Sequence, residues 1–485
     1  MWRFRCYTFG SCTALPAVKS FALHTGVILQ PSRLQYDSYR MNPNALAEAT
    51  SRATETKEIV IAPGATDQAA DLFGRHFPAS LPVVIADSNT YDVAGRSVDA
   101  ILRRAYPNMA EPIVLPGSPR LQPLDSLSDD IAAALSGSSN RAVAVGSGTL
   151  NDIVKLASHR SDRSYMLVAT AASVDGYASF GASMLAEGWK QTIPCPAGRV
   201  LLADPDVLAS APKQMAASGY ADLLGKLTAG ADWIIAEELG IEEIDAEIWA
   251  MVQTELREWI DHPAAIRRGD VAAISELFAG LTMSALAMQA YRDTRPASGT
   301  EHLLSHTWEM EHLEYEGEPV SHGFKVGIGT LAAAALLEVL FDSSIDSDVV
   351  ARAVRRRLSI EDRESQIQNA FGAKRFTRSL IATGVAKHDR GESHARRIRR
   401  AADRWESLGA RLKGQVPPFD ELRRLLESAG CPVTPKEIGV TNARLANTYR
   451  KAQMVRKRYT SLDLAFDLNI LDSSIETIFA SGRYF

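Results

Sequence analysis

Asp222, His302 and His322 are the residues of this sequence whose types best suit a metal ion. One carboxylate and two imidazoles suit a borderline divalent ion such as zinc, nickel or ferrous iron. Three protein ligands leave coordination positions open for a substrate, so a site of this kind would perform chemistry rather than hold the fold together. We therefore take these residues as one candidate metal site.

His306 lies four residues after His302, so in a helix both rings share one face, and either or both could bind the metal. Lys226 lies one helical turn beyond Asp222 and could pair with a carboxylate or, less favoured, contact a substrate phosphate. The rival ligands are Glu301, Glu309 and His312, of which Glu301 is expected at most as a partner of a ligand.

Two loops rich in glycine and hydroxyl residues follow apolar runs. The first, Gly146–Asp152, opens a helix, whose free N–H groups could bind a phosphate. It departs from the Rossmann fingerprint because Asn151 stands where the third glycine would be, and an ordinary tight turn is the alternative. The second, Thr170–Ser179, could bind ribose, a nicotinamide amide or a polyol, or it could cap a helix. Asp87 could likewise accept a ribose hydroxyl or start a turn.

The elements that would position these residues change character near residue 202. Before it, short β-branched runs closed by turn residues alternate with helix-length segments, which predicts a largely parallel α/β sheet with ligands at the carboxyl ends of its strands. The predicted strands are 59–62, 82–86, 113–115, 141–145 and 165–169. After it, the predicted helices are 206–237, 243–259, 271–292, 302–313, 327–340 and 421–429.

The predicted organisation is an α/β nucleotide-binding domain at 56–200 followed by a mostly α-helical metal-binding domain at 201–485. Residues 1–55 are expected to be an extension, either disordered or preceding the true start at Met41. The apolar run at 329–337 is cut by Glu338, too early for a membrane span of about 20 residues, and is predicted to be a buried core helix.

Composition says little about partners. The net charge of −5 gives no reason to expect nucleic acid or an anionic membrane, and the arginines at 352–411 are interleaved with acidic residues, which is typical of a solvated helical face. The four scattered cysteines suggest neither a disulfide framework nor a thiolate zinc site and fit a reducing cytoplasm. A homodimer is the default expectation.

Several motifs, in order, resemble the bacterial sn-glycerol-1-phosphate dehydrogenase family. They are Gly-x-Gly-Thr-x-Asn-Asp, Thr-Ala-Ala-Ser-x-Asp-Gly-x-Ala-Ser, Gly-x-Ala-Asp-Leu-x-Gly-Lys, Ser-Gly-x-Glu-His-x-x-Ser-His and Ser-His-Gly, followed by the segment 456–465. The family belongs to the superfamily of iron-containing alcohol dehydrogenases, glycerol dehydrogenase and dehydroquinate synthase. The resemblance implies the dehydroquinate-synthase-like fold.

The resemblance also implies roles for individual residues. It assigns the metal to Asp222, His302 and His322, the substrate to Asp175, Asp222 and His306, and catalysis to Asp222 and His306. The implied NAD or NADP positions are Asp87, Gly148, Thr149, Leu150, Asn151, Asp152, Thr170, Ala171, Ala172, Ser173 and Ser179. A ribose-binding Asp87 would favour NAD, because it would repel a 2′-phosphate.

The implied reaction is the reversible reduction of dihydroxyacetone phosphate to sn-glycerol 1-phosphate, with His306 or a water on the metal relaying the proton. The nearest alternative is a polyol or glycerol dehydrogenase acting on a non-phosphorylated substrate. A lyase resembling dehydroquinate synthase is disfavoured because Phe324-Lys325 stands where that family commonly has Glu. A non-catalytic nucleotide-binding protein would be expected to have lost a metal ligand.

Overall fold

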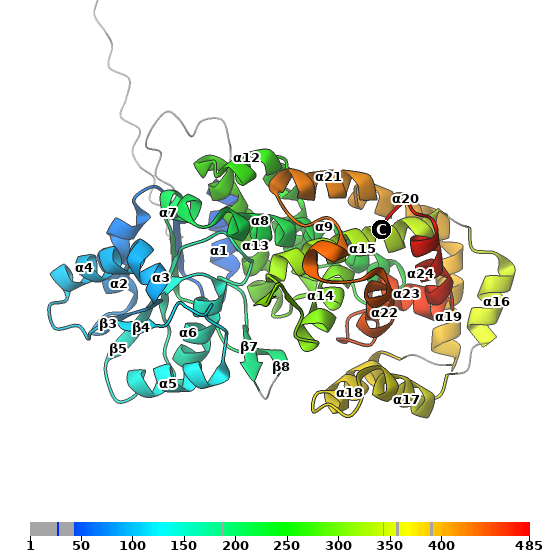
Figure 1. Ribbon diagram of the computed structural model, residues 1–485, viewed down its shortest axis with the longest axis horizontal. Helices are drawn as coiled ribbons and strands as arrows, with labels where there is room; N and C mark the ends of the chain where they lie inside the picture. The colour runs from blue at the N-terminus through cyan, green and yellow to red at the C-terminus, as the bar shows by residue number, and fades with distance from the viewer. Residues whose placement is uncertain (1–26, 29–42, 187–188, 343, 356–357, 389–390) are drawn as a thin grey trace, which may run out of the picture.

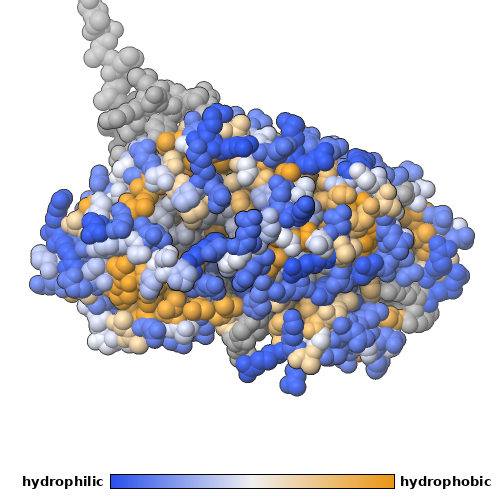
Figure 2. Space-filling view, viewed as in Figure 1, coloured by the Kyte–Doolittle hydropathy of each residue, from blue (hydrophilic) through white to orange (hydrophobic). Residues whose placement is uncertain are grey.

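The computed structural model describes residues 27–28 and 43–485, except 187–188, 343, 356–357 and 389–390. It has two parts lying side by side (Figure 1), a parallel sheet covered by helices near the N-terminus and a larger helical part that runs to the C-terminus. This arrangement confirms the predicted fold class. Figure 2 shows a mostly hydrophilic face, with hydrophobic residues gathered over the lower part of the sheet domain.

The main sheet of the described residues has seven strands in the order β1-β2-β9-β6-β5-β3-β4, all paired in parallel. Because every neighbour is parallel, the carboxyl ends of the strands meet at one edge, where ligands bind in such sheets. The strands are β1 (Val27–Ile28), β2 (Glu58–Ile61), β3 (Leu81–Asp87), β4 (Ile113–Leu115), β5 (Asn140–Gly146), β6 (Met166–Ala169) and β9 (Val200–Ala203). Five of these match the predicted runs.

Alternate side chains of the buried strands enter two separate cores, as the twofold period of a strand requires. Val60 and Val168 belong to a small core closed by α2 (Ala69–His76) and α4 (Arg96–Ala105). Ile59 and Leu167 point to the opposite face, into a larger core that is continuous with the helical part. The sheet is therefore packed directly onto the domain that carries the predicted metal ligands.

Two predicted boundaries do not coincide with the ends of secondary-structure elements. The division at residue 200 falls inside β9, which pairs with β2 and β6 in the middle of the sheet, so the α/β domain extends to at least Ala203. β9 is short and is followed directly by Asp204-Pro205, which begins α7, so the strand fell within the region predicted as a boundary. The extension predicted for 1–55 contains α1 (Pro43–Arg52), whose Leu46 and Ala49 are buried against the core. Residues 1–26 and 29–42 lie outside the described residues.

The helices that matter for the site are α6 (Gly148–Arg160) in the sheet domain and α8 (Lys213–Leu224), α9 (Lys226–Glu238), α13 (Val271–Tyr291), α14 (Thr300–Met310) and α15 (His322–Phe341) in the helical domain. α13 and α15 are long and apolar enough to cross a membrane, but most of each is buried inside the structure, which is typical of core helices. The prediction of a buried helix at 329–337 is confirmed.

The remaining elements complete the two domains. An antiparallel hairpin, β7 (Ala182–Ala186) and β8 (Trp189–Ile193), was not predicted and projects from the sheet domain toward α14. The other elements are α3 (Ser88–Thr90), α5 (Asp125–Leu135), α7 (Pro205–Ser210), α10 (Ala246–Gln253), α11 (Leu256–Trp259), α12 (Pro263–Arg268), β10 (Glu314–Tyr315), β11 (Glu318–Pro319), α16 (Ser347–Arg355), α17 (Ile360–Phe371), α18 (Thr377–Lys387), α19 (Gly391–Asp403), α20 (Trp405–Gln415), α21 (Phe419–Ala429), α22 (Asn442–Ala452), α23 (Ser461–Asp467) and α24 (Leu471–Ala480).

Glycines allow α8, α14 and α15 to cross closely. A Cβ at Gly323 would lie 1.8 Å from the carbonyl oxygen of Ser218, and one at Gly329 would lie 2.4 Å from that of Glu301. A Cβ at Gly219 would lie 2.1 Å from the carbonyl oxygen of Ala172, in the loop after β6. Backbone therefore packs on backbone where these helices meet each other and the sheet domain.

We expect Gly219→Ala to destabilise the protein by about 1–3 kcal/mol or more, because the added methyl group has no free volume and must displace a backbone. The measurement is the midpoint of thermal unfolding. Gly414→Ala is the matched control, since a Cβ there meets nothing within 4 Å; it should leave stability unchanged or raise it by about 0.5–1 kcal/mol. An unchanged midpoint for Gly219→Ala would contradict the close approach.

Candidate metal centre and active site

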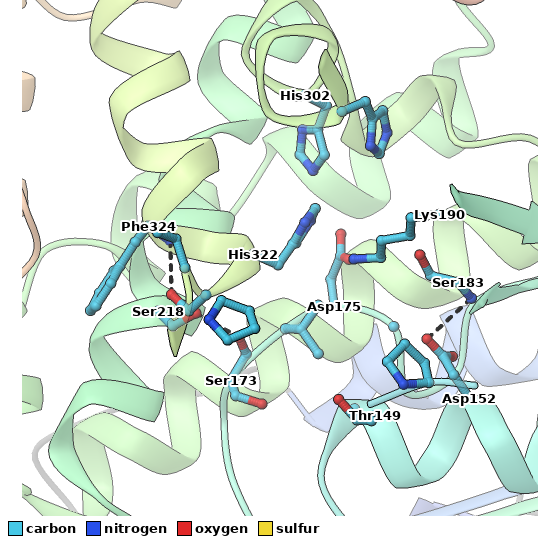
Figure 3. A pocket seen from close by; sticks show the side chains of 18 of the residues that line it. Thr149, Asp152, Ser173, Asp175, Ser183, Lys190, Ser218, His302, His322 and Phe324 are labelled. Atoms are coloured by element: carbon cyan, nitrogen blue, oxygen red, sulfur yellow. Dashed lines mark hydrogen bonds between the residues drawn. The ribbon is translucent and has the colours of Figure 1, made fainter. Parts of the chain in front are cut away.

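A cavity of about 680 Å³ lies between the two domains. One side is lined by the loops after β5 and β6, and the other by α14, the start of α15 and the loop after α22. Figure 3 shows His302 and His322 on one side of this cavity and Thr149, Asp152 and Ser173 on the other. The arrangement places imidazoles opposite the glycine-rich loop.

The structure brings the predicted ligands together. Asp222, His302 and His322 each offer one ligand atom, and these atoms all lie within 4.8 Å of one another. The three residues come from three helices, since Asp222 lies in the last turn of α8, His302 in the first turn of α14, and His322 at the first position of α15. Ser321 caps the N-terminus of α15, because its Oγ accepts the N–H of Phe324.

Carboxylates orient both imidazoles. Nδ1 of His302 lies 2.8 Å from Oε1 of Glu301, and Nδ1 of His322 lies 3.0 Å from Oε1 of Glu309. With Nδ1–H donated to a carboxylate, each ring can offer Nε2 to a metal ion, which is the arrangement usual for metal-binding histidines. The donor set and its supporting carboxylates therefore fit a divalent metal. The expectation that Glu301 is a partner of a ligand agrees with this geometry.

Asp222 is fully buried and is kept ionised by its neighbours. Burial alone would raise its pKa, but the Lys226 ammonium, 2.7 Å from Oδ1, and the hydrogen bond from His302 hold the pKa well below its usual value. The backbone N–H of Asp175 donates to Oδ2 over 3.0 Å. The carboxylate is thus available as a ligand throughout the physiological pH range.

Lys226 also pairs with Asp175, whose Oδ2 lies 2.8 Å away and accepts a hydrogen bond from Ser284 as well. The interpretation of Lys226 as a partner of a carboxylate is confirmed. Contact with a substrate phosphate is disfavoured, because Lys226 is completely buried beneath the two aspartates and does not line the cavity. Asp175 lines the cavity and Asp222 is buried next to it, and contact of either residue with the substrate stays a prediction.

His306 lies one helical turn from His302, with ring centroids 6.1 Å apart, and it lines the same cavity. Its Nδ1 is 3.0 Å from Oε2 of Glu309. Burial lowers the pKa of His306 to about 3, so the ring is neutral at pH 7 with Nε2 as an acceptor. Asp222, His302 and His322 form the cluster without it, and contact of His306 with the substrate stays a prediction.

Glu309, a rival ligand in the sequence, has a different role. Its buried carboxylate contacts His306 and His322 through hydrogen bonds, and Lys190 and Lys325 through ion pairs of 2.9 and 3.2 Å. Burial opposes ionisation, but the two ammonium groups and the two rings keep its pKa well below the usual value. Burial also lowers the pKa of Lys325 to about 8, which leaves it mostly protonated at pH 7.

The glycine-rich loop presents the start of α6 to the cavity. Ser147, Gly148, Thr149 and Asp152 line it, and no side chain caps this helix start, so its free N–H groups fit an anionic group such as a dinucleotide phosphate. A Cβ at Gly148 would lie 2.6 Å from Cγ1 of Val174, so the glycine lets the two loops approach.

Some predicted cofactor positions face the cavity and others support it. Ser173 and Ser179 line it, whereas Leu150, Thr170, Ala171 and Ala172 are buried behind it. Asn151 is also buried; its amide donates to the carbonyls of Gly176 and Tyr177. Cofactor contact by these residues stays a prediction.

Asp87 lies at the carboxyl end of β3 but does not line this cavity. Its Oδ1 accepts the N–H groups of Asn89 and Thr90, so the turn interpretation is confirmed for that oxygen. Contact with a ribose stays a prediction. His312, the third rival ligand, follows the end of α14 and also lies outside the cavity lining.

Sequence reasoning missed Lys190, Thr192 and Arg456 as residues of this cavity. The first two alternate along β8, so the twofold pattern of 189–193 was a usable signal for a strand with one polar face. Arg456 belongs to the segment that resembles the family near the C-terminus, but no role was assigned to it.

A parallel sheet whose strand-end loops face a buried carboxylate and two imidazoles defines a class, that of metal-dependent dehydrogenases built from an α/β and a helical domain. In agreement, residues 60–212 match the family model described as iron-containing alcohol dehydrogenase. The crystal structure of glycerol dehydrogenase from Schizosaccharomyces pombe has a similar fold, with a TM-score of 0.54 and 15% identity over 89% of this chain and 93% of that chain.

Proteins with similar sequences identify the family of this chain. This chain is 37% identical over 388 residues to the glycerol-1-phosphate dehydrogenase (NAD(P)+) of Bacillus velezensis, covering 79% of this chain and 84% of the relative. It is 32% identical over 413 residues to that of Bacillus subtilis strain 168, covering 84% and 90%. The chain belongs to the glycerol-1-phosphate dehydrogenase family.

The different contacts of the two histidines of α14 predict different metal contents. His302→Ala should lose bound metal, whereas His306→Ala should retain it, because the ligand cluster forms without His306. The measurement is the metal content of purified, dialysed protein by elemental analysis, with circular dichroism to show that both variants fold. Equal metal loss in both variants would contradict the assignment.

Glu301→Gln should weaken metal binding by about 10- to 100-fold, because the carboxylate that orients His302 would lose its charge. The measurement is a competition titration with a chelator of known affinity. Glu311→Gln is the control, since Glu311 pairs with Arg444 and Lys451 outside the ligand cluster. Indistinguishable affinities for the two variants would refute the orienting role of Glu301.

Proposed function

We propose that this protein catalyses the NAD(P)-dependent, reversible reduction of dihydroxyacetone phosphate to sn-glycerol 1-phosphate. The observation that carries the proposal is the cluster of Asp222, His302 and His322, whose two histidines line one cavity opposite the start of α6. The named activity of the relatives from Bacillus velezensis and Bacillus subtilis supports the choice of substrate.

Asp222, His302 and His322 would hold one divalent ion, zinc, nickel or iron, and the loops at 146–152 and 170–179 would hold the nicotinamide cofactor. When bound, the metal supplies Lewis-acid polarisation of the ketone and the reduced nicotinamide supplies the hydride. The reaction balances with the hydride adding to C2, one proton adding to its oxygen, and the nicotinamide leaving oxidised.

The chain's own residues position the substrate and handle the proton. Lys226 and the N–H of Asp175 hold the Asp222 carboxylate in one orientation. Glu309 holds the Nδ1 proton of His306, which leaves Nε2 to exchange a hydrogen bond with a substrate hydroxyl. In the oxidation direction Nε2 would take the proton of the alcohol and pass it to water, and in the reduction direction the transfer is reversed.

The remaining expectations about the cell are part of the proposal. We place the protein in the cytoplasm as a homodimer that acts on a small molecule, without nucleic acid or membrane as a partner. Cys195 and Cys431 are buried free thiols, which fits a reducing compartment. The mostly buried α13 and α15 have the property expected of core helices.

The test is a steady-state assay of the purified protein with dihydroxyacetone phosphate and either NADH or NADPH, before and after treatment with a chelator. We expect chelation to abolish turnover and added zinc, nickel or ferrous iron to restore it. Equal activity on dihydroxyacetone and its phosphate would instead favour a polyol dehydrogenase. Activity that survives complete metal removal would refute the metal-dependent mechanism.

A further inference from the structure

Cationic side chains line the part of the cavity beside His306, and the proposed mechanism leaves them without a role. Lys190 comes from β8 of the sheet domain, and Arg456 comes from the loop between α22 and α23 of the helical domain. Figure 3 shows Lys190 extending into the cavity between His322 and Ser183. Two domains therefore contribute positive charge to one place.

Arg456 is exposed to the cavity and lacks a carboxylate partner among the described residues. Its side chain donates a long hydrogen bond, of 3.4 Å, to Oγ1 of Thr192 on β8. Arg458, two residues later, is by contrast paired with Asp293 at 2.9 Å and bonded to Thr294. The Arg456 guanidinium thus keeps most of its donors for a ligand.

Lys190 and His306 both contact the carboxylate of Glu309. Nζ of Lys190 is 2.9 Å from Oε1 of Glu309, whose Oε2 is 3.0 Å from Nδ1 of His306. An ammonium has three donors, so Lys190 retains donors that a ligand in the cavity can use. The lysine therefore lies beside the proposed substrate histidine and close to the metal-ligand cluster.

The charge of this region matches a phosphate monoester. The carboxylate of Glu309 pairs with both Lys190 and Lys325, and Arg456 also interacts with it, so cations outnumber this anion. A phosphate monoester carries about −1.5 to −2 at pH 7. Guanidinium and ammonium groups are the usual partners of such an anion.

This region is distinct from the place suited to the cofactor phosphates. Thr149 and Asp152 at the start of α6 lie across the cavity from His302 (Figure 3), whereas Lys190 pairs with Glu309 of α14, which also contacts His306. An anion held here would belong to the substrate rather than to the dinucleotide. In a three-carbon phosphate the phosphorus lies only about three bonds from the reacting carbon, so an anion site near the metal ligands suits it.

We propose that Arg456 and Lys190, with Thr192, bind the phosphate group of the substrate and so decide between phosphorylated and free trioses. This inference rests on the proposed function, since it names the residues that select the phosphorylated substrate in the same cavity. The binding site requires the hairpin of one domain and the loop of the other, so substrate phosphate would join the two domains.

The test compares kcat/KM for dihydroxyacetone phosphate and for dihydroxyacetone in the metal-loaded enzyme. Arg456→Gln should lower the ratio of the two values by about 10- to 100-fold, mainly through a higher KM for the phosphate. Lys190→Gln should lower it in the same direction, and Arg456→Lys should restore part of it. Lys457→Gln is the control, because this exposed neighbour does not line the cavity, and its ratio should equal that of the wild type.

Inorganic phosphate provides a second probe in the same enzyme. It should inhibit wild-type reduction of dihydroxyacetone phosphate competitively, and Arg456→Gln should weaken that inhibition by at least about tenfold. An unchanged substrate ratio with unchanged phosphate inhibition in both glutamine variants overturns the inference while leaving the activity intact. A wild type that does not reduce dihydroxyacetone phosphate overturns the proposed function instead. Should either variant fail to fold, the other variant and wild-type phosphate inhibition decide the question.

Discussion

The buried charge of Asp222 is the interaction on which the rest of the site depends. An ionised carboxylate without contact to water is stable only if its charge and its lone pairs are matched, and here Lys226, His302 and the N–H of Asp175 match them. Those partners come from α9, from α14 and from the loop after β6, so compensating one charge requires both domains to be in place. The close backbone contacts at Gly219, Gly323 and Gly329 follow from that requirement, because bulkier residues would hold the helices too far apart.

Glu309 is a second buried carboxylate whose charge is matched by its neighbours. Its carboxylate orients one metal-ligand candidate, His322, and the proposed substrate histidine, His306, and it also pairs with Lys190 of the hairpin. A single buried acid therefore ties the geometry of the metal site to that of the substrate site. Lys190 therefore connects the hairpin of the sheet domain to the carboxylate that orients both rings.

Features that depend on local residue patterns could be predicted from the sequence, whereas contacts between distant residues could not. The strands and the candidate ligands could be found because apolar runs closed by turn residues and histidines at i,i+4 are local patterns. Glu309 and Lys190 could not be paired in advance, because they lie 119 residues apart and their types are common on any surface. Strand β9 was assigned to a boundary because only its neighbours in space, β2 and β6, reveal that it completes the sheet. The family resemblance added the separate roles of His302 and His306, which spacing alone left open.

Two opposite charge excesses lie next to each other in this cavity, and together they account for its chemistry. Asp175 and Asp222 pair with the cation Lys226, and Glu301 lies against His302, so these three carboxylates outnumber the cation and favour a divalent ion. Without the ion, burial disfavours a charged His302, yet hydrogen bonds to Asp222 and Glu301 raise its pKa, so a proton replaces part of the missing charge. Around Glu309 the excess is positive and suits a dianion. Neutral His306 lies between the two regions, and a substrate that carries both a ketone and a phosphate can satisfy both at once.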